Sequence, residues 1–330
     1  MHLAENVYIT HYNILVEYSA MHDLRTSYKK CMKLLRMSCQ KLFEYDGKTN
    51  TRKYTNKPIL SDIEVVCLAI TAEALQIDSE NLLWSKLKTD YPDLFQVLPH
   101  RTRYNARKKY LRNIIAEISN IVSDLICDNT EQTDLLVIDS MPIEICKIVR
   151  ENNSLQFRRS TDEVKAAKGF NSAHKQYYLG YKLHLITNEA GIYRDMLITP
   201  ANVHDIEFLK ELKKEDIHLM GKTLLGDRAY LSHTHQLRLF EDLDLNVNVP
   251  YRRNQKDFKK YSHHYKIKRK TIETTFAQYI DEYLIRRNYS KSFAGFDVRI
   301  NCKIAAKTLK QLWNVIHEKP VNHTKHAFAA

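Results

Sequence analysis

Apolar and polar positions along the second half of the chain predict a sheet. The unbroken branched run Leu135 to Ile138 is typical of a strand buried on both faces. From Leu179 to Leu185 apolar residues alternate with Gly, Lys and His, which predicts a strand with one buried face. Tyr193 to Thr199 returns beside it after a turn. With shorter runs at 223–226 and 245–249, we expect a mixed sheet of five strands.

Helical periodicity predicts a different architecture in the first part of the chain. Ser61 and Glu64 form a capping-box signal at the start of an apolar stripe with helical spacing. A second helix is expected to begin near Asp78 or Ser79. A longer one follows Pro99 and carries a sustained apolar stripe. We therefore expect a group of packed helices before the sheet.

These elements predict an α/β protein with two domains. The segment 46–57 is polar, basic and poor in large aliphatic residues, which indicates a linker. We expect an α-helical N-terminal domain over residues 1–130 and a sheet domain with flanking helices over 131–318. Residues 319–330 are polar and are expected to form a frayed tail.

Composition and charge narrow the class of protein. The 330 residues carry a net charge of +12, which favours a polyanionic partner, most commonly nucleic acid, although basic proteins without such a partner exist. The six cysteines form no CxxC pair, which is typical of a reducing compartment. The sequence shows no signal peptide and no apolar run of transmembrane length. We expect a soluble, cytoplasmic protein with no membrane partner.

Three acidic residues stand at positions where a carboxylate needs a partner. Asp139 and Asp227 each follow a predicted strand, and a charge at the rim of a sheet is unfavourable unless a cation meets it. Glu273 lies next to the apolar stripe of a predicted helix, from which its side chain can reach a sheet edge. The alternative for Asp139 is that it caps a turn beside Ser140 and Pro142.

Charge repulsion explains why such acids would gather around metal. Two carboxylates about 4 Å apart repel by roughly 4 kcal/mol at an effective dielectric of 20, so a cluster stays ionised only around cations. Mg²⁺ and Mn²⁺ take oxygen ligands and keep positions open for water and phosphate. Two such ions, about 3.5 to 4 Å apart, stabilise both oxygens of an in-line displacement at phosphorus. The order Asp139, Asp227, Glu273 is the ligand set expected of such a two-metal site.

Several segments resemble a known family. VIDSMPIEICK at 137–147, LLGDRAY at 224–230 and RKTIETTFAQ at 269–278 resemble the three signature blocks of bacterial insertion-sequence transposases with a DDE catalytic domain, most closely insertion-sequence family nine-eighty-two. Further similar segments are ANVHD at 201–205, PYRRNQK at 250–256, SDIEVVCLAITAEALQIDSE at 61–80 and LPHRTRYNARKK at 98–109. The resemblance covers about residues 60 to 290.

The resemblance has consequences for fold and chemistry. It implies a ribonuclease-H-like core, a divalent metal, and cutting and joining of transposon-end DNA. It also implies that Asp139, Asp227 and Glu273 are the catalytic triad. Two protomers or more are a family-level inference, because two DNA ends must be joined.

One part of the family pattern is incomplete. Related transposases often carry a Tyr, Arg, Glu, Lys signature around the last acid. Arg269 stands four residues before Glu273 as the pattern requires, but Lys266 fills the Tyr position and Ile280 the Lys position. Arg269 is therefore expected to contact DNA, and the final Lys has no counterpart.

Two basic stretches are candidates for DNA binding. Residues 101–112 hold six basic residues and no acid, which fits a helix-turn-helix-like domain or, equally, a helical bundle with a solvated basic face. Residues 252–270 hold nine basic residues and one acid with aromatics between them, a pattern that tracks phosphates and stacks bases, or is simply a solvated face. The DNA-binding residues expected here are Arg101, Arg103, Arg107, Lys108, Arg252, Arg253, Lys256 and Arg269.

The sequence thus predicts a DDE transposase that acts on transposon ends and target DNA with two Mg²⁺ or Mn²⁺ ions. His204 and Asp205 are further candidates near the metals, although an Asp at this position is more often a helix cap. Two alternatives remain at this point. One is a non-catalytic DNA-binding regulator, and the other is a ribonuclease-H-like nuclease or resolvase that never joins strands.

Overall fold

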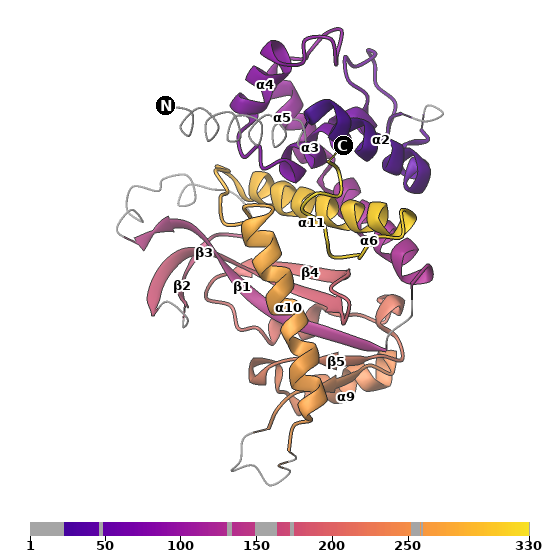
Figure 1. Ribbon diagram of the computed structural model, residues 1–330. Helices are drawn as coiled ribbons and strands as arrows, with labels where there is room; N and C mark the ends of the chain where they lie inside the picture. The colour runs from indigo at the N-terminus through magenta and orange to yellow at the C-terminus, as the bar shows by residue number, and fades with distance from the viewer. Residues whose placement is uncertain are drawn as a thin grey trace, which may run out of the picture. The chain divides into compact units, whose positions relative to one another are not determined.

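The computed structural model describes residues 23–45, 49–130, 134–148, 164–171, 175–251, 258 and 260–329. The chain divides into two compact units (Figure 1). One comprises Met1–Val122 together with Asn301–Ala330, and the other comprises Ser123–Ile300. The domain boundaries that the sequence analysis placed at residues 130 and 318 stay predictions.

The first unit is built from helices. Its elements are α2 (Leu24–Ser38), the short 3₁₀ helix η1 (Gln40–Phe43), α3 (Asp62–Ala74), α4 (Glu80–Thr89), α5 (Arg101–Tyr110), the first part of α6 (Arg112–Asp128) and the last part of α11 (Phe293–Ile316). Helix α3 is buried on nearly all sides and packs against α2 and α5. This unit is therefore organised around one central helix.

Local signals placed the helix starts correctly. At the start of α3, the Ser61 amide donates to Glu64 Oε2 at 2.7 Å, and both halves of the predicted capping box are present. Ser79 caps α4, as expected from its position. The long helix expected after Pro99 is instead two helices, because Leu111 leaves the helical conformation between α5 and α6 while its side chain is fully buried.

The expected linker is wrong for the part of it that the structure describes. Residues 49–57 are held against α3 by hydrogen bonds, including one from the Ile63 amide to the Thr49 carbonyl oxygen at 3.1 Å. Residue composition indicated only polarity, and polar residues satisfied by protein partners look the same in sequence as solvated ones.

The second unit contains a mixed sheet of six strands. They are β1 (Leu135–Lys147), β2 (Ala167–Asn171), β3 (Gln176–Asn188), β4 (Tyr193–Pro200), β5 (Thr223–Leu225) and β6 (Asn246–Asn248). The order is β2-β3-β1-β5-β6, and β4 also pairs with β3. Strands β1, β3 and β4 are antiparallel, whereas β5 and β6 join β1 in parallel. This is the arrangement expected of a ribonuclease-H-like sheet.

Two sequence expectations about the sheet need correction. Strand β1 runs 13 residues to Lys147, so Asp139 lies within the strand and not at its end. The segment Ala167–Asn171, which is not among the five strands predicted from the sequence, forms strand β2 against the start of β3. Both differences arise from pairing with β3, whose 13 residues are long enough to extend its neighbours.

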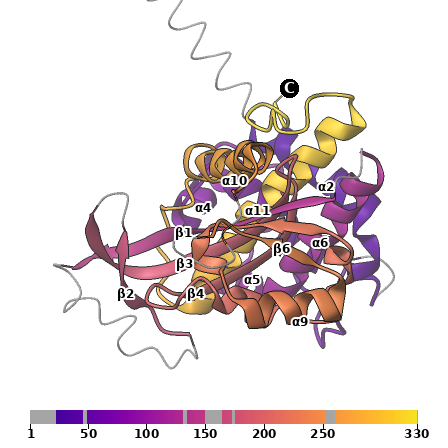
Figure 2. The same ribbon diagram turned by 90° about the horizontal axis from the view of Figure 1, so that it is seen from below.

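Helices cover both faces of the sheet (Figure 2). On one face Leu136, Ile138 and Leu224 join a buried core with residues of α8 (Glu207–Glu211) and α9 (His233–Leu243). On the other face α10 (His263–Asp281) packs against β1. Because side chains alternate along a strand, Asp139 points to the face covered by α10, opposite to Ile138. None of the described helices has the length and apolar character needed to cross a membrane.

Candidate active site

The parallel pairing of β1 with β5 brings two of the predicted acids to the same level. Val137 pairs with Leu225 in this register. Asp139 and Asp227 each follow this last pair by two residues, and the backbone of Asp227 is extended, with φ −87° and ψ −176°. The charge of Asp227 also acts on Asp139, which agrees with this placement. Neighbouring strands lie about 4.8 Å apart, and residues in register point to the same face. The two carboxylates therefore lie on one face of the sheet.

A glycine allows this close approach at the tip of β5. A Cβ on Gly226 would lie 3.1 Å from Ile138 Cγ2, 3.1 Å from Tyr230 Cδ2 and 3.3 Å from Val249 Cγ1. Contacts this short would push the neighbouring side chains apart. Gly226 therefore keeps the backbone that carries Asp227 packed against β1.

Asp139 lies in an environment that disfavours its charge. Burial is the main reason why the pKa of Asp139 is raised to about 6, and the negative charges of Asp227 and Asp205 contribute to the rise. The Ser140 amide, which donates to Asp139 Oδ1 at 2.8 Å, and the Arg269 guanidinium act in the opposite direction. The surrounding protein thus compensates the carboxylate only in part.

Asp227 is held by the turn that follows it. Its Oδ1 accepts a hydrogen bond from the Ala229 amide at 2.8 Å and caps the 3₁₀ turn η4 (Arg228–Tyr230). Asp227 is half-buried. This local contact orients the Asp227 carboxylate just after the end of β5.

Asp205 contributes to the same electrostatic environment. Its side chain forms an ion pair with Lys182 on β3, with an N–O distance of 2.5 Å. It does not cap the next helix, because the N-cap of α8 is Ile206 and has no side-chain cap. The neighbouring His204 is exposed. Of the two residues of ANVHD considered near the acids, Asp205 is therefore the one whose charge reaches Asp139.

Sequence reasoning missed Tyr230, which closes the LLGDRAY segment. Its side chain is fully buried, and its hydroxyl has no hydrogen-bond partner of good geometry in the part of the chain that the structure describes. Burial raises the pKa of Tyr230, and the charges of Asp205, Asp139 and Asp227 add to this effect. The only sequence signal was its position three residues after Asp227.

Glu273 lies on α10, the helix that packs against β1. The buried side of α10 is formed by Ile272, Thr275, Phe276 and Tyr279. Glu273 is exposed next to this stripe, one turn after Arg269, whose charge does reach Asp139. In the described residues, no three Asp, Glu, His or Cys side chains lie close enough to hold a metal ion. The structure thus brings Asp139 and Asp227 together and leaves Glu273 outside that pair.

The carboxylate pair has the chemistry that a divalent cation requires. Mg²⁺ and Mn²⁺ prefer carboxylate oxygens, and the pKa of Asp139 is raised first by burial and then by the negative charges of Asp227 and Asp205, both of which a bound cation would offset. Asp139 and Asp227 therefore fit a divalent cation as two of its ligands. The third predicted ligand, Glu273, is not brought to them in this arrangement of the chain.

The basic residues predicted to bind DNA differ in their exposure and in whether an acidic side chain already pairs with them. Arg103 is exposed and Arg101 is half-buried on α5. Arg107 forms an ion pair with Asp62 at 2.5 Å, and Lys108 is buried in an ion pair with Glu80 at 2.5 Å. The predicted residues Arg252, Arg253 and Lys256 lie outside the described residues.

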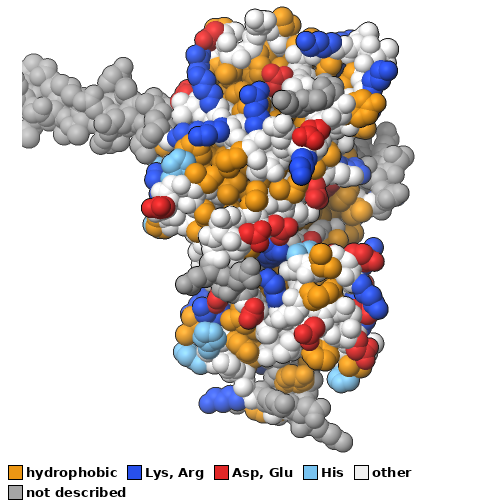
Figure 3. Space-filling model, turned by 90° about the vertical axis from the view of Figure 1, so that its right-hand side faces the viewer, with side chains coloured by type: hydrophobic (Ala, Val, Ile, Leu, Met, Phe, Trp, Pro, Cys, Tyr) orange, Lys and Arg blue, Asp and Glu red, His pale blue; other side chains and the backbone are white. Residues whose placement is uncertain are grey.

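One face of the molecule carries side chains of both charges. On the face drawn in Figure 3, Lys and Arg side chains are interspersed with Asp and Glu. The net charge of +12 therefore does not form a continuous positive surface on this face.

Comparisons with known proteins were made by family model, by structure and by sequence. A family model described as a transposase DDE domain matches residues 129–291. A structural comparison finds a piggyBac transposase synaptic complex with hairpin DNA, solved by cryo-EM, at a TM-score of 0.44 and 10% identity, covering 93% of this chain and 78% of that chain. No curated protein matches the chain in sequence.

The matched range contains Asp139, Asp227 and Glu273 together with all six strands. The closer assignment to insertion-sequence family nine-eighty-two stays a prediction. Residues 129–291 of this chain form a transposase DDE domain.

Proposed function

We propose that this transposase cuts DNA at the ends of a mobile element and joins the released 3′ ends to target DNA, using Asp139, Asp227 and Glu273. The observation that carries the proposal is the pair of half-buried carboxylates of Asp139, on β1, and Asp227, two residues after the parallel strand β5, with the pKa of Asp139 raised to about 6. A buried structural carboxylate is normally neutralised by a cationic partner, whereas Asp139 is buried beside the further negative charges of Asp227 and Asp205.

Asp139 and Asp227 are proposed to hold divalent metal, Mg²⁺ or Mn²⁺, as DDE domains generally do. A bound cation supplies activation of water and stabilisation of charge on phosphate oxygens. Glu273 is proposed as the third ligand, which requires α10 or the Glu273 side chain to move toward the pair. The count of two ions stays part of the proposal.

The proposed chemistry is two successive displacements at phosphorus. In the first, a water oxygen bonds to phosphorus and the bond from phosphorus to the 3′ oxygen breaks, which leaves a 3′-hydroxyl and a 5′-phosphate. In the second, that 3′-hydroxyl bonds to a phosphorus of target DNA and displaces the adjoining 3′ oxygen there. Both steps need the same arrangement of acids, so one site serves for both.

Arg269 is proposed to hold DNA next to the acids. It lies on the face of α10 that reaches Asp139 electrostatically, and its Nε is buried without a hydrogen-bond partner in the described part of the chain. A guanidinium with unused donors is suited to a phosphate oxygen. The proposed DNA contacts are therefore Arg269, Arg101 and Arg103. Arg107 and Lys108 are left out of this set because each is paired with an acidic side chain of the protein.

The test uses a supercoiled plasmid that carries the element's own ends, incubated with Mg²⁺. The parent chain should nick and join, whereas Asp139→Ala, Asp227→Ala and Glu273→Ala should not. Asp134→Ala is the matched control, because Asp134 is exposed just before β1. Cutting and joining by Asp139→Ala at the parent rate would refute the assignment.

The products separate this function from its alternatives. Gel-shift binding without Mg²⁺-dependent nicking would identify a DNA-binding regulator. Nicking without any strand-transfer product would identify a nuclease or resolvase. Joining of two ends in one complex calls for two protomers or more. Sedimentation of the protein bound to its DNA ends measures the number of protomers in that complex.

A further inference from the structure

We propose that the helical unit contains a preformed binding site for the DNA phosphate backbone, built by residues 49–64 together with the end of α2. The ligand class rests on the proposed function, since a DNA-cutting enzyme must hold DNA away from the reacting bond. The site itself rests on a separate set of contacts, none of which involves the acids of the sheet.

The site is a cavity of about 610 Å³ with a strongly basic lining. Arg36 enters from α2, and Arg52, Lys53 and Lys57 enter from the segment before α3. All four side chains belong to exposed residues. Glu64 is the one acid of the described lining, and its Oε2 is occupied by the Ser61 amide and hydroxyl at 2.7 and 2.8 Å. The lining therefore carries three net positive charges.

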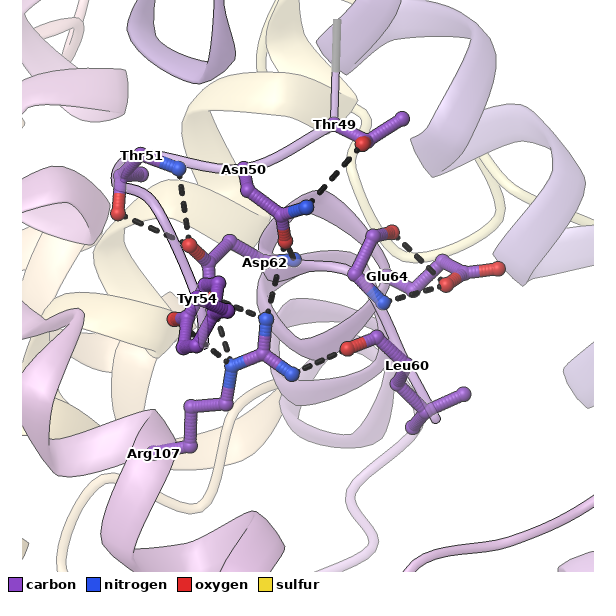
Figure 4. A network of polar contacts seen from close by, with 9 residues as sticks. Thr49, Asn50, Thr51, Tyr54, Leu60, Asp62, Glu64 and Arg107 are labelled. Atoms are coloured by element: carbon purple, nitrogen blue, oxygen red, sulfur yellow. Dashed lines mark hydrogen bonds and ion pairs between the residues drawn. The ribbon is translucent and has the colours of Figure 1, made fainter. Parts of the chain in front are cut away.

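A buried carboxylate holds the backbone that presents these cations (Figure 4). Asp62 is fully buried and accepts hydrogen bonds from the Thr51 amide and hydroxyl, both at 2.9 Å, and from the Tyr54 hydroxyl at 2.7 Å. These contacts fix both residues that flank Arg52 and Lys53. A segment that is already ordered loses less conformational entropy when it binds a ligand.

Arg107, on α5, also holds the segment before α3 in place. Its guanidinium pairs with Asp62 at 2.5 Å, donates to Asn50 Oδ1 at 3.1 Å and also donates to the Leu60 carbonyl oxygen. Asn50 Oδ1 accepts from the Asp62 amide at 2.9 Å as well. Arg107 thus joins the two ends of the segment, at Asn50 and Leu60, to one helix. Its role in DNA binding is to position the segment.

Aromatic rings orient the outward-facing arginine. The Arg52 guanidinium lies 4.0 Å from the ring centre of Tyr110 and 4.9 Å from that of Tyr54. Tyr54 is therefore held by Asp62 through its hydroxyl and stabilises Arg52 through its ring. Exposed Tyr45 and Ile59 add apolar surface to the lining. Cations ordered among aromatic side chains are the pattern that binds phosphates and adjacent bases.

The experiment measures salt dependence of DNA binding by the full chain in EDTA, so that no cutting occurs. The probe is a fluorescent 30-base-pair duplex of arbitrary sequence, followed by anisotropy between 50 and 300 mM salt. Lys53→Ala/Lys57→Ala should lower the slope of log K against log salt by about 1.8, which is about 60-fold in affinity at 0.1 M salt. Lys53→Arg/Lys57→Arg keeps both charges and should keep the parent slope.

The matched control is Lys319→Ala/Lys325→Ala, which removes two exposed charges from the same unit outside the cavity. Fluorescence of Trp84 and Trp313, which both belong to this unit, verifies that each variant is folded. An equal change of slope in the control pair, an unchanged slope in the cavity pair, or no duplex binding by the parent would overturn the inference. The plasmid test with Asp139→Ala reports independently on the proposed function.

Discussion

Replacing Asp139 with Asn should stabilise the metal-free protein at neutral pH. The pKa of Asp139 is raised from 3.8 to about 6, chiefly by burial and also by the charge of Asp227. The folded state therefore binds the proton more tightly than the unfolded chain, and stability falls as pH rises from about 4 to about 6. Asn keeps the oxygen that accepts from the Ser140 amide while it removes the charge.

The size of the effect follows from the two pKa values. At about 1.4 kcal/mol per pKa unit, the ionised carboxylate costs about 3 kcal/mol at pH 7.5 and about 1 kcal/mol at pH 4.5. Asp139→Asn should therefore increase the free energy of unfolding by up to these amounts. The gain should be largest in EDTA, because a bound cation would stabilise the parent carboxylate and not the amide.

Urea unfolding at both pH values, followed by circular dichroism in EDTA, measures this gain. Tryptophan fluorescence would not report it, because Trp84 and Trp313 both lie in the helical unit. Exposed Asp134 is the control, and Asp134→Asn should change the free energy of unfolding by less than about 0.5 kcal/mol. A loss of stability in Asp139→Asn, or a gain that is the same at pH 4.5 and pH 7.5, would refute the reasoning.

Three further substitutions test other parts of the structure. Glu273→Gln should abolish plasmid cutting but leave the urea midpoint nearly unchanged, since this side chain is exposed. Gly226→Ala should cost about 1–3 kcal/mol in urea unfolding, because the new methyl lies 3.1 Å from two buried neighbours; an unchanged midpoint would contradict that packing. Arg107→Ala should destabilise the helical unit by about 3–5 kcal/mol, as it leaves the Asp62 carboxylate buried without its cation. Tryptophan fluorescence in urea measures this loss, and Arg103→Ala, exposed on the same helix, should show almost none.

Local patterns in the sequence predicted the elements that carry the site. The apolar run before Asp139, the short run before Asp227 and the helical stripe beside Glu273 each became the expected strand or helix. The capping box at Ser61 also formed as predicted. These features succeed because neighbouring residues determine strand and helix preference through spacing and capping.

Long-range pairing decided the features that the sequence did not reveal. The extension of β1 past Asp139 and the formation of β2 both depend on hydrogen bonds to β3. The register of β1 with β5, which sets Asp227 beside Asp139, pairs residues that are far apart in the chain. A strand's pattern shows which face is buried but leaves its partner and its register open.

The basic residues give the clearest contrast between the two kinds of information. Sequence determined that positive charge gathers at 101–112, and it grouped Arg103 with Arg107 as equal candidates for DNA. Only the tertiary structure distinguished them, because the partner of Arg107 is Asp62, 45 positions earlier and fully buried. The sequence does not distinguish a basic residue that solvent or DNA can reach from one that a buried carboxylate neutralises. They differ in what lies within a few ångströms of them after folding.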